Sequence, residues 1–201
     1  MESCLVLIGG VSDHAYLLDQ LTQCKHLWRK LVGKYGRQHI YNLEYQHIMD
    51  RHAIMMKSIL DPVRLALTPN GWAAERYVED YLKDLSYKYD KIDVITHSQG
   101  SWMIMKTDVK LNTLWNIANP IGWFAPIARM MVQMNIWSPK VEVNNLFYLY
   151  STEDFVSKRP PKIKGKWTCK ADYVEVIDTK TSHDARKYLV KLNSHYPWIF
   201  N

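Results

Sequence analysis

Short runs of consecutive apolar residues alternate along the chain with longer stretches in which apolar residues recur every three or four positions. Runs of the first kind are typical of buried strands, and periodic stretches are typical of helices with one buried face. The strand candidates lie at 4–8, 38–44, 112–118, 144–150 and 172–178 and at the start of 91–106, and of these 4–8 and 112–118 are short apolar runs. The periodic stretches lie at 15–32, 72–89 and 184–193, with a less clear one around 48–60. This alternation predicts an α/β fold whose central, mostly parallel sheet of about six strands is flanked by helices.

Glycines and chain length set the expected boundaries. Gly33 and Gly36 follow the stretch at 15–32 and are expected to end that helix. The chain has 201 residues and no obvious linker, so we expect one domain over 1–201. Residues 120–140 are irregular and rich in Trp and Met.

The positive charge of the chain belongs to a single segment. Lys and Arg total 26, Asp and Glu total 20, and the formal net charge is +6. Residues 158–170 contain six basic residues and no acidic one, which accounts for the whole excess. A spread-out nucleic-acid-binding face is therefore not expected. The segment is interpreted either as a solvated loop or as a loop that attracts an anionic substrate, surface or polymer.

The cysteines and the apolar runs favour a cytoplasmic protein. Cys4, Cys24 and Cys169 have no CxxC spacing, and an odd count without a pattern fits a reducing compartment. The run at 4–8 is too short for a signal peptide. The longest apolar-looking stretch, 115–137, is interrupted by polar residues and prolines, so no transmembrane segment is expected.

A serine lies at a tight turn between a strand and a helix. Val94 and Ile95 end the strand, Ser98 follows, and Trp102 lies in the start of the helix. This places the serine at the carboxyl edge of a parallel sheet, where such sheets bind ligands. The turn requires small residues two positions before and after the serine, where the chain has Thr96 and Gly100.

The turn resembles the GxSxG nucleophile elbow of the α/β-hydrolase superfamily, with Thr96 in place of the first glycine. In that superfamily the acid follows the next-to-last strand and the histidine follows the last one. Here Asp154 follows 144–150 and His183 follows 172–178. The resemblance extends from residue 4 to about 193 and implies Ser98 as nucleophile, His183 as general base and Asp154 as the acid that orients it.

Other acids and histidines compete for these roles. Glu153 is adjacent to Asp154, but Asp154 better matches the family because an aromatic residue and a valine follow it. Asp178 and Asp184 are too close to His183 in sequence to come from a separate acid loop. Of the seven rival histidines, the serious ones are His14, His97 and His195, and we expect the His97 ring to pack sideways beside the nucleophile.

The resemblance also implies an oxyanion hole and a cap. One backbone N–H would come from Gln99 and a second from the loop after the first strand, from Val11 or else from Gly10. In this family a cap often follows the strand after the elbow, which corresponds to 120–140. The residues expected to contact an apolar part of the substrate are Trp123, Phe124, Met130 and Met134. The alternative is that 120–140 packs a crossover helix onto the sheet.

No cofactor or metal is required for such chemistry. His39, His47 and His52 lack the HExxH spacing and a carboxylate-rich partner motif, so no metal site is expected. The sequence therefore predicts an esterase-like or lipase-like serine hydrolase acting on a small-molecule ester. A thioesterase or amidase with the same residues, a catalytically inactive fold used for binding, and a protein that binds an anionic polymer through 158–170 remain as alternatives. The oligomeric state is not indicated.

Overall fold

The computed structural model describes most of the chain. The described residues are 2–10, 16–45, 48, 69–120, 140–154, 157, 162–163, 166–167 and 169–195. In these ranges no helix has both the length and the hydropathy that a membrane span requires. The predictions for 48–60 and 120–140 lie outside them, apart from Ile48, Pro120 and Lys140.

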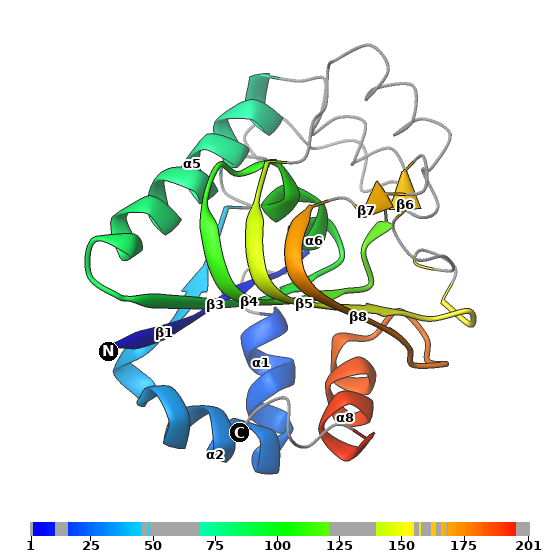
Figure 1. The fold of residues 1–201 in the computed structure, drawn as a ribbon. Helices are drawn as coiled ribbons and strands as arrows, with labels where there is room; N and C mark the ends of the chain where they lie inside the picture. The colour runs from blue at the N-terminus through cyan, green and yellow to red at the C-terminus, as the bar shows by residue number, and fades with distance from the viewer. Residues whose placement is uncertain are drawn as a thin grey trace.

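A six-stranded parallel sheet crosses the centre of the molecule (Figure 1). Its order is β2-β1-β3-β4-β5-β8, and every neighbouring pair is parallel. The strands are β1 (Ser3–Ile8), β2 (Ile40–Leu43), β3 (Lys91–His97), β4 (Lys110–Ile117), β5 (Glu142–Tyr150) and β8 (Lys170–Asp178). The predicted fold class and strand positions are confirmed. The strand order reverses direction between β1 and β3, so a crevice is expected beyond their carboxyl ends.

Helices cover both faces of the sheet. One face carries α5 (Pro69–Ser86), α6 (Gln99–Met103) and the 3₁₀ turn η2 (Ile104–Lys106). The other carries α1 (Tyr16–Gln23), α2 (Lys25–Tyr35) and α8 (Ala185–His195), as Figure 1 shows. The 3₁₀ turn η1 (Arg37–His39) leads into β2. Alternate residues of each strand point to opposite faces. Val6 therefore packs in the core under α5, whereas Leu5 and Leu7 pack with the other helices.

The helix predicted at 15–32 is two helices, which corrects that expectation. The helices α1 and α2 meet at Cys24, whose backbone dihedrals are not helical. The apolar residues keep helical spacing across this break, so the pattern leaves it undetected. The helix also continues through Gly33 and ends at Gly36, where φ is 79°. Glycine is tolerated inside a helix, and only a positive φ makes it a terminator.

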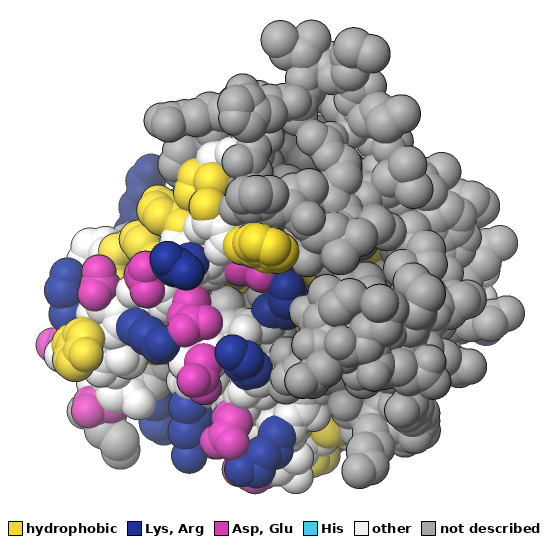
Figure 2. Space-filling view, turned by 90° about the horizontal axis from the view of Figure 1, so that it is seen from above, with side chains coloured by type: hydrophobic (Ala, Val, Ile, Leu, Met, Phe, Trp, Pro, Cys, Tyr) yellow, Lys and Arg dark blue, Asp and Glu magenta, His cyan; other side chains and the backbone are white. Residues whose placement is uncertain are grey.

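The basic segment 158–170 contains a short hairpin that the sequence did not predict. Lys162–Ile163 forms β6 and pairs in antiparallel fashion with β7, Lys166–Trp167. The rest of the segment, up to the start of β8, lies mostly outside the described residues. On the face that carries α5, the described Lys and Arg side chains are interspersed with Asp and Glu (Figure 2). The described part of that face therefore has no large area of one charge.

Candidate active site

Ser98 lies in a strained turn between β3 and α6. Its φ of 53° and ψ of −120° are unfavourable for a residue with a side chain. The strain is held by two backbone hydrogen bonds: the amide of Ser98 donates to the carbonyl of Ile117 at 3.0 Å, and the amide of Ser101 donates to the carbonyl of Ser98 at 3.0 Å. This geometry is typical of a nucleophile elbow.

The residues on either side of Ser98 explain how the turn packs. A Cβ atom added at Gly100 would lie 2.4 Å from the carbonyl oxygen of Ile8 and 2.5 Å from that of Gly9, so only glycine fits without movement. Thr96 is fully buried, yet its hydroxyl lies 2.9 Å from Ser101 Oγ. It also donates to a backbone carbonyl of β4 at 3.3 Å. The departure from the first glycine of the motif is therefore accommodated by hydrogen bonds.

The loops after β5 and β8 bring the predicted acid and histidine to this serine. His183 Nε2 lies 3.0 Å from Ser98 Oγ, and His183 Nδ1 lies 2.8 Å from Asp154 Oδ2. Asp154 is buried and the His183 side chain is 29 % exposed. The hydroxyl, imidazole and carboxylate thus form a continuous hydrogen-bonded chain. Such a chain can move a proton from the hydroxyl to the imidazole while the carboxylate stabilises the resulting cation.

The competing acids have other positions. Glu153 is exposed, whereas its neighbour Asp154 is buried against His183. Asp178 accepts hydrogen bonds from the backbone amides of Thr152 and Lys180. Asp184 accepts a hydrogen bond from a backbone amide at the start of α8. The geometry thus favours Asp154 over each of them.

His97 packs against the histidine of the hydrogen-bonded chain. The two rings have centroids 5.0 Å apart and are tilted by 39°. His97 is buried, and burial, with a smaller effect of His183, lowers its pKa to about 3. It is therefore neutral at neutral pH. The other rival histidines have undescribed side chains, because His14 and the side chain of His195 lie outside the described part of the chain.

Ser151 joins the two loops, a role that the sequence did not reveal. Its hydroxyl donates to the carbonyl of Thr181 at 2.6 Å and accepts from the amide of Thr181 at 2.7 Å. The amide of Thr179 donates to the carbonyl of Tyr150 at 2.9 Å. These bonds fix the acid loop relative to the histidine loop. A serine directly after a strand carries no sequence signal for such a contact.

One side of the expected oxyanion hole is described. A Cβ atom added at Gly10 would lie 3.3 Å from Ser98 Cβ, so the loop after β1 passes directly beside the serine. Gln99 is the first residue of α6. The buried hydroxyl of Tyr45 lies 3.0 Å from the carbonyl oxygen of Gly9 and 3.4 Å from Gln99 Oε1, so it links the loop after β1 to the start of α6. Tyr45 was not anticipated from the sequence.

Some predicted residues cannot be placed. Val11 and the expected substrate contacts lie outside the described residues, and those contacts are Trp123, Phe124, Met130 and Met134. Their roles remain predictions. Among the described residues, no group of three or more His, Cys, Asp or Glu side chains could hold a metal ion.

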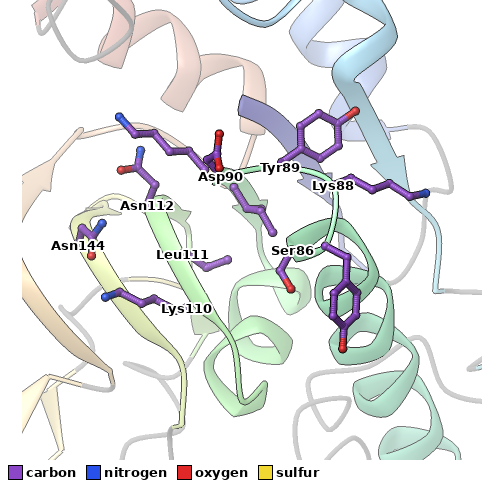
Figure 3. Close-up of a pocket in the computed structure, with 11 residues that line it drawn as sticks. Ser86, Lys88, Tyr89, Asp90, Lys110, Leu111, Asn112 and Asn144 are labelled. Carbon is purple, nitrogen blue, oxygen red and sulfur yellow. The ribbon is translucent and has the colours of Figure 1, made fainter. Parts of the chain in front are cut away.

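A pocket of about 510 Å³ lies at the opposite edge of the sheet (Figure 3). Residues from the starts of β3, β4 and β5 line it, together with the turn after α5. The side chains of Lys88 and Lys110 point in different directions and do not converge on one point. None of the three hydrogen-bonded side chains at Ser98 lines this pocket, so it is separate from the candidate active site.

The parallel sheet, the strained serine turn and the order of the loops define an α/β-hydrolase-like fold. Two solved structures are similar to it. Esterase PE8 has a TM-score of 0.53 and 12 % identity, over 94 % of this chain and 90 % of that chain. The Pyrococcus furiosus esterase Pf2001 has a TM-score of 0.46 and 13 % identity, over 98 % of this chain and 78 % of that chain. The likeness to PE8 confirms the predicted fold. No protein-family model and no curated protein matches the sequence.

Proposed function

We propose that the chain is a serine hydrolase that cleaves a carboxylic ester through an acyl-enzyme. The observation that carries the proposal is the chain of contacts from Ser98 Oγ to His183 at 3.0 Å and from His183 to Asp154 at 2.8 Å. The fold shared with a protein described as an esterase supports the same choice. The three cysteines are free thiols, which supports the cytoplasm as the compartment.

The residues have distinct roles in the proposed reaction. Ser98 Oγ attacks the ester carbonyl carbon while His183 Nε2 takes the hydroxyl proton. The ester C–O bond then breaks, and the leaving alkoxide takes that proton from His183. Water repeats the sequence on the acyl-enzyme and regenerates Ser98. Backbone amides of Gln99 and of Val11 or Gly10 stabilise the oxyanion.

The test uses a fluorophosphonate probe and a series of p-nitrophenyl esters from acetate to octanoate. Wild type is expected to be labelled and to turn over the esters, and Ser98→Ala to lose both. Longer acyl chains are expected to be preferred if 120–140 supplies an apolar wall. A thioester and an anilide assayed in parallel distinguish thioesterase and amidase activities.

Two adjacent acids provide a matched comparison. Asp154→Asn is expected to lower kcat by several orders of magnitude, because the imidazole loses its orienting carboxylate. Glu153→Gln, on the exposed neighbour, is expected to leave kcat unchanged. Wild-type protein that is neither labelled nor active would refute the proposal and favour an inactive fold used for binding. The reverse ranking of the two variants would refute only the choice of acid.

A further inference from the structure

The carboxylate of Asp154 contacts two buried hydroxyl groups in addition to His183. Ser157 Oγ lies 2.7 Å from Asp154 Oδ2, and Tyr188 OH lies 2.8 Å from the same oxygen. The two hydroxyl oxygens are themselves 2.7 Å apart. One carboxylate oxygen therefore faces an imidazole N–H and a pair of mutually bonded hydroxyls.

Proton counting limits how this triangle can be arranged. The ionised carboxylate has no proton, and each hydroxyl has one, so two protons serve three short contacts. Either both hydroxyls donate to Asp154, or one donates to the carboxylate and the other to the first hydroxyl. In both arrangements at least one hydroxyl proton stabilises the charge on Oδ2. In the second, the chain of hydrogen bonds strengthens the donor that touches the carboxylate.

The two hydroxyls come from different parts of the chain. Ser157 follows the acid loop, and Tyr188 is one turn into α8, which begins just after His183. Both are fully buried. Both contact Asp154 Oδ2, the same oxygen that lies 2.8 Å from His183 Nδ1.

We propose that Tyr188 and Ser157 are positioning residues that act on His183 through the Asp154 carboxylate, moderating its attraction for the imidazolium. The inference rests on the proposed function, because it assigns these residues to the same serine hydrolase site. Hydroxyl donors take up part of the negative charge on Oδ2. Less of that charge then remains to stabilise a protonated His183, so the imidazole gives up its proton more readily.

The titratable groups around Asp154 and His183 make this measurable. In the described part of the chain, the groups that face this pair are His97 from the end of β3 and Tyr188 from α8. Burial lowers the pKa of His97 to about 3 and raises the pKa of Tyr188 well above its ordinary value. Neither changes charge near neutral pH, so neither contributes to a pH profile measured there.

The experiment measures the pH dependence of kcat/KM and, independently of turnover, the titration of the His183 imidazole by NMR. Tyr188→Phe and Ser157→Ala are each expected to raise the pKa of His183 by about 0.5–1 unit, because removing a donor strengthens the pull of Asp154. The acidic limb of kcat/KM should move to higher pH by the same amount. KM should change less than kcat.

Tyr35→Phe is the matched control. Tyr35 is also a buried tyrosine, and its hydroxyl donates to a different buried carboxylate, Asp93, at 2.5 Å. Its removal should affect folding stability but leave the titration of His183 where it is. A pKa of His183 that stays constant or falls in either test variant overturns the assignment for that residue. An equal rise in Tyr35→Phe overturns the proposal as a whole.

The two proposals can fail separately. A wild-type protein without ester turnover would refute the proposed function. The NMR titration would still show whether the hydroxyls act on His183 through Asp154. Conversely, a fully active wild type with an unmoved titration would retain the hydrolase and refute the positioning role. Tyr188→Phe and Ser157→Ala remove different hydroxyls. If one variant does not fold, the other still tests the proposal.

Discussion

Replacing Gly100 with alanine tests whether the turn that carries Ser98 must lie directly against the end of β1. The added Cβ atom would be 2.4 Å from the carbonyl oxygen of Ile8, and contacts below 3.0 Å essentially do not occur. The two backbones would have to separate by about 0.6 Å. Neither can yield easily, because Ile8 is in register with Thr96 of the neighbouring strand.

Both stability and turnover should therefore fall. Forced overpacking of a well-packed region costs about 1–3 kcal/mol. The same movement displaces the loop that carries Gly9 and Gly10 away from Ser98, and a misplacement approaching 1 Å costs about 10²-fold in rate. We expect Gly100→Ala to lose stability in this range and to retain about one hundredth of the wild-type kcat.

Gly33→Ala is the control for the same chemical change. Gly33 lies inside α2, and an added Cβ atom there would meet nothing within 4 Å. Alanine is the better helix former, so this variant should gain about 0.5–1 kcal/mol and keep full activity. Urea unfolding followed by circular dichroism gives the free energies, and p-nitrophenyl butyrate hydrolysis gives kcat. A Gly100→Ala protein with wild-type stability and turnover would refute the packing of the turn against β1.

Two further predictions concern groups beside the serine. Gly10→Ala should lower kcat by about 10- to 100-fold with little loss of stability, because its Cβ atom would lie 3.3 Å from Ser98 Cβ and crowd Ser98 rather than the core. A loss of kcat that comes with a large loss of unfolding free energy would contradict this prediction. His97 is protonated more readily in the unfolded chain, because burial lowers its pKa in the fold from 6.5 to about 3. The unfolding free energy should therefore rise as pH increases between these values and level off above them, and His97→Asn should flatten the rise. Urea unfolding at several pH values measures the unfolding free energy of the wild type and of the variant. If that free energy rises with pH as steeply in His97→Asn as in the wild type, His97 is not buried in its neutral form.

The strands and the positions of Ser98, Asp154 and His183 could be predicted because the sequence patterns that mark them are local. The inner strands β1, β3, β4 and β5 are mostly buried, and burial on both faces favours an apolar run such as 4–8. Ser98 is marked by its turn, and Asp154 and His183 by their places after strands. Parallel strands all end at one edge of the sheet, so residues distant in sequence were expected to meet there.

The hydroxyl groups that support the site could not be predicted in this way. Tyr188 occupies a helical position that an apolar pattern accounts for equally well, and Ser151, Ser157 and Tyr45 are single polar residues without a motif. Their partners are chosen only when separate elements pack together. Sequence periodicity records which face of an element is buried, but it does not record which atom a buried hydroxyl will meet.

Two buried tyrosine–aspartate pairs show how position decides chemistry. Tyr35 donates to Asp93, whose other carboxylate oxygen accepts from Asn112 at 2.6 Å, and Tyr188 donates to Asp154. Asp93 lies in the first half of β3, toward the edge opposite Ser98, and its hydrogen bonds join α2, β3 and β4. Asp154 lies at the carboxyl edge, where the loop after β8 supplies an imidazole at 2.8 Å. The same buried pair thus joins elements of the fold at one edge, and at the other its carboxylate also accepts from the imidazole of His183, whose Nε2 lies 3.0 Å from Ser98 Oγ.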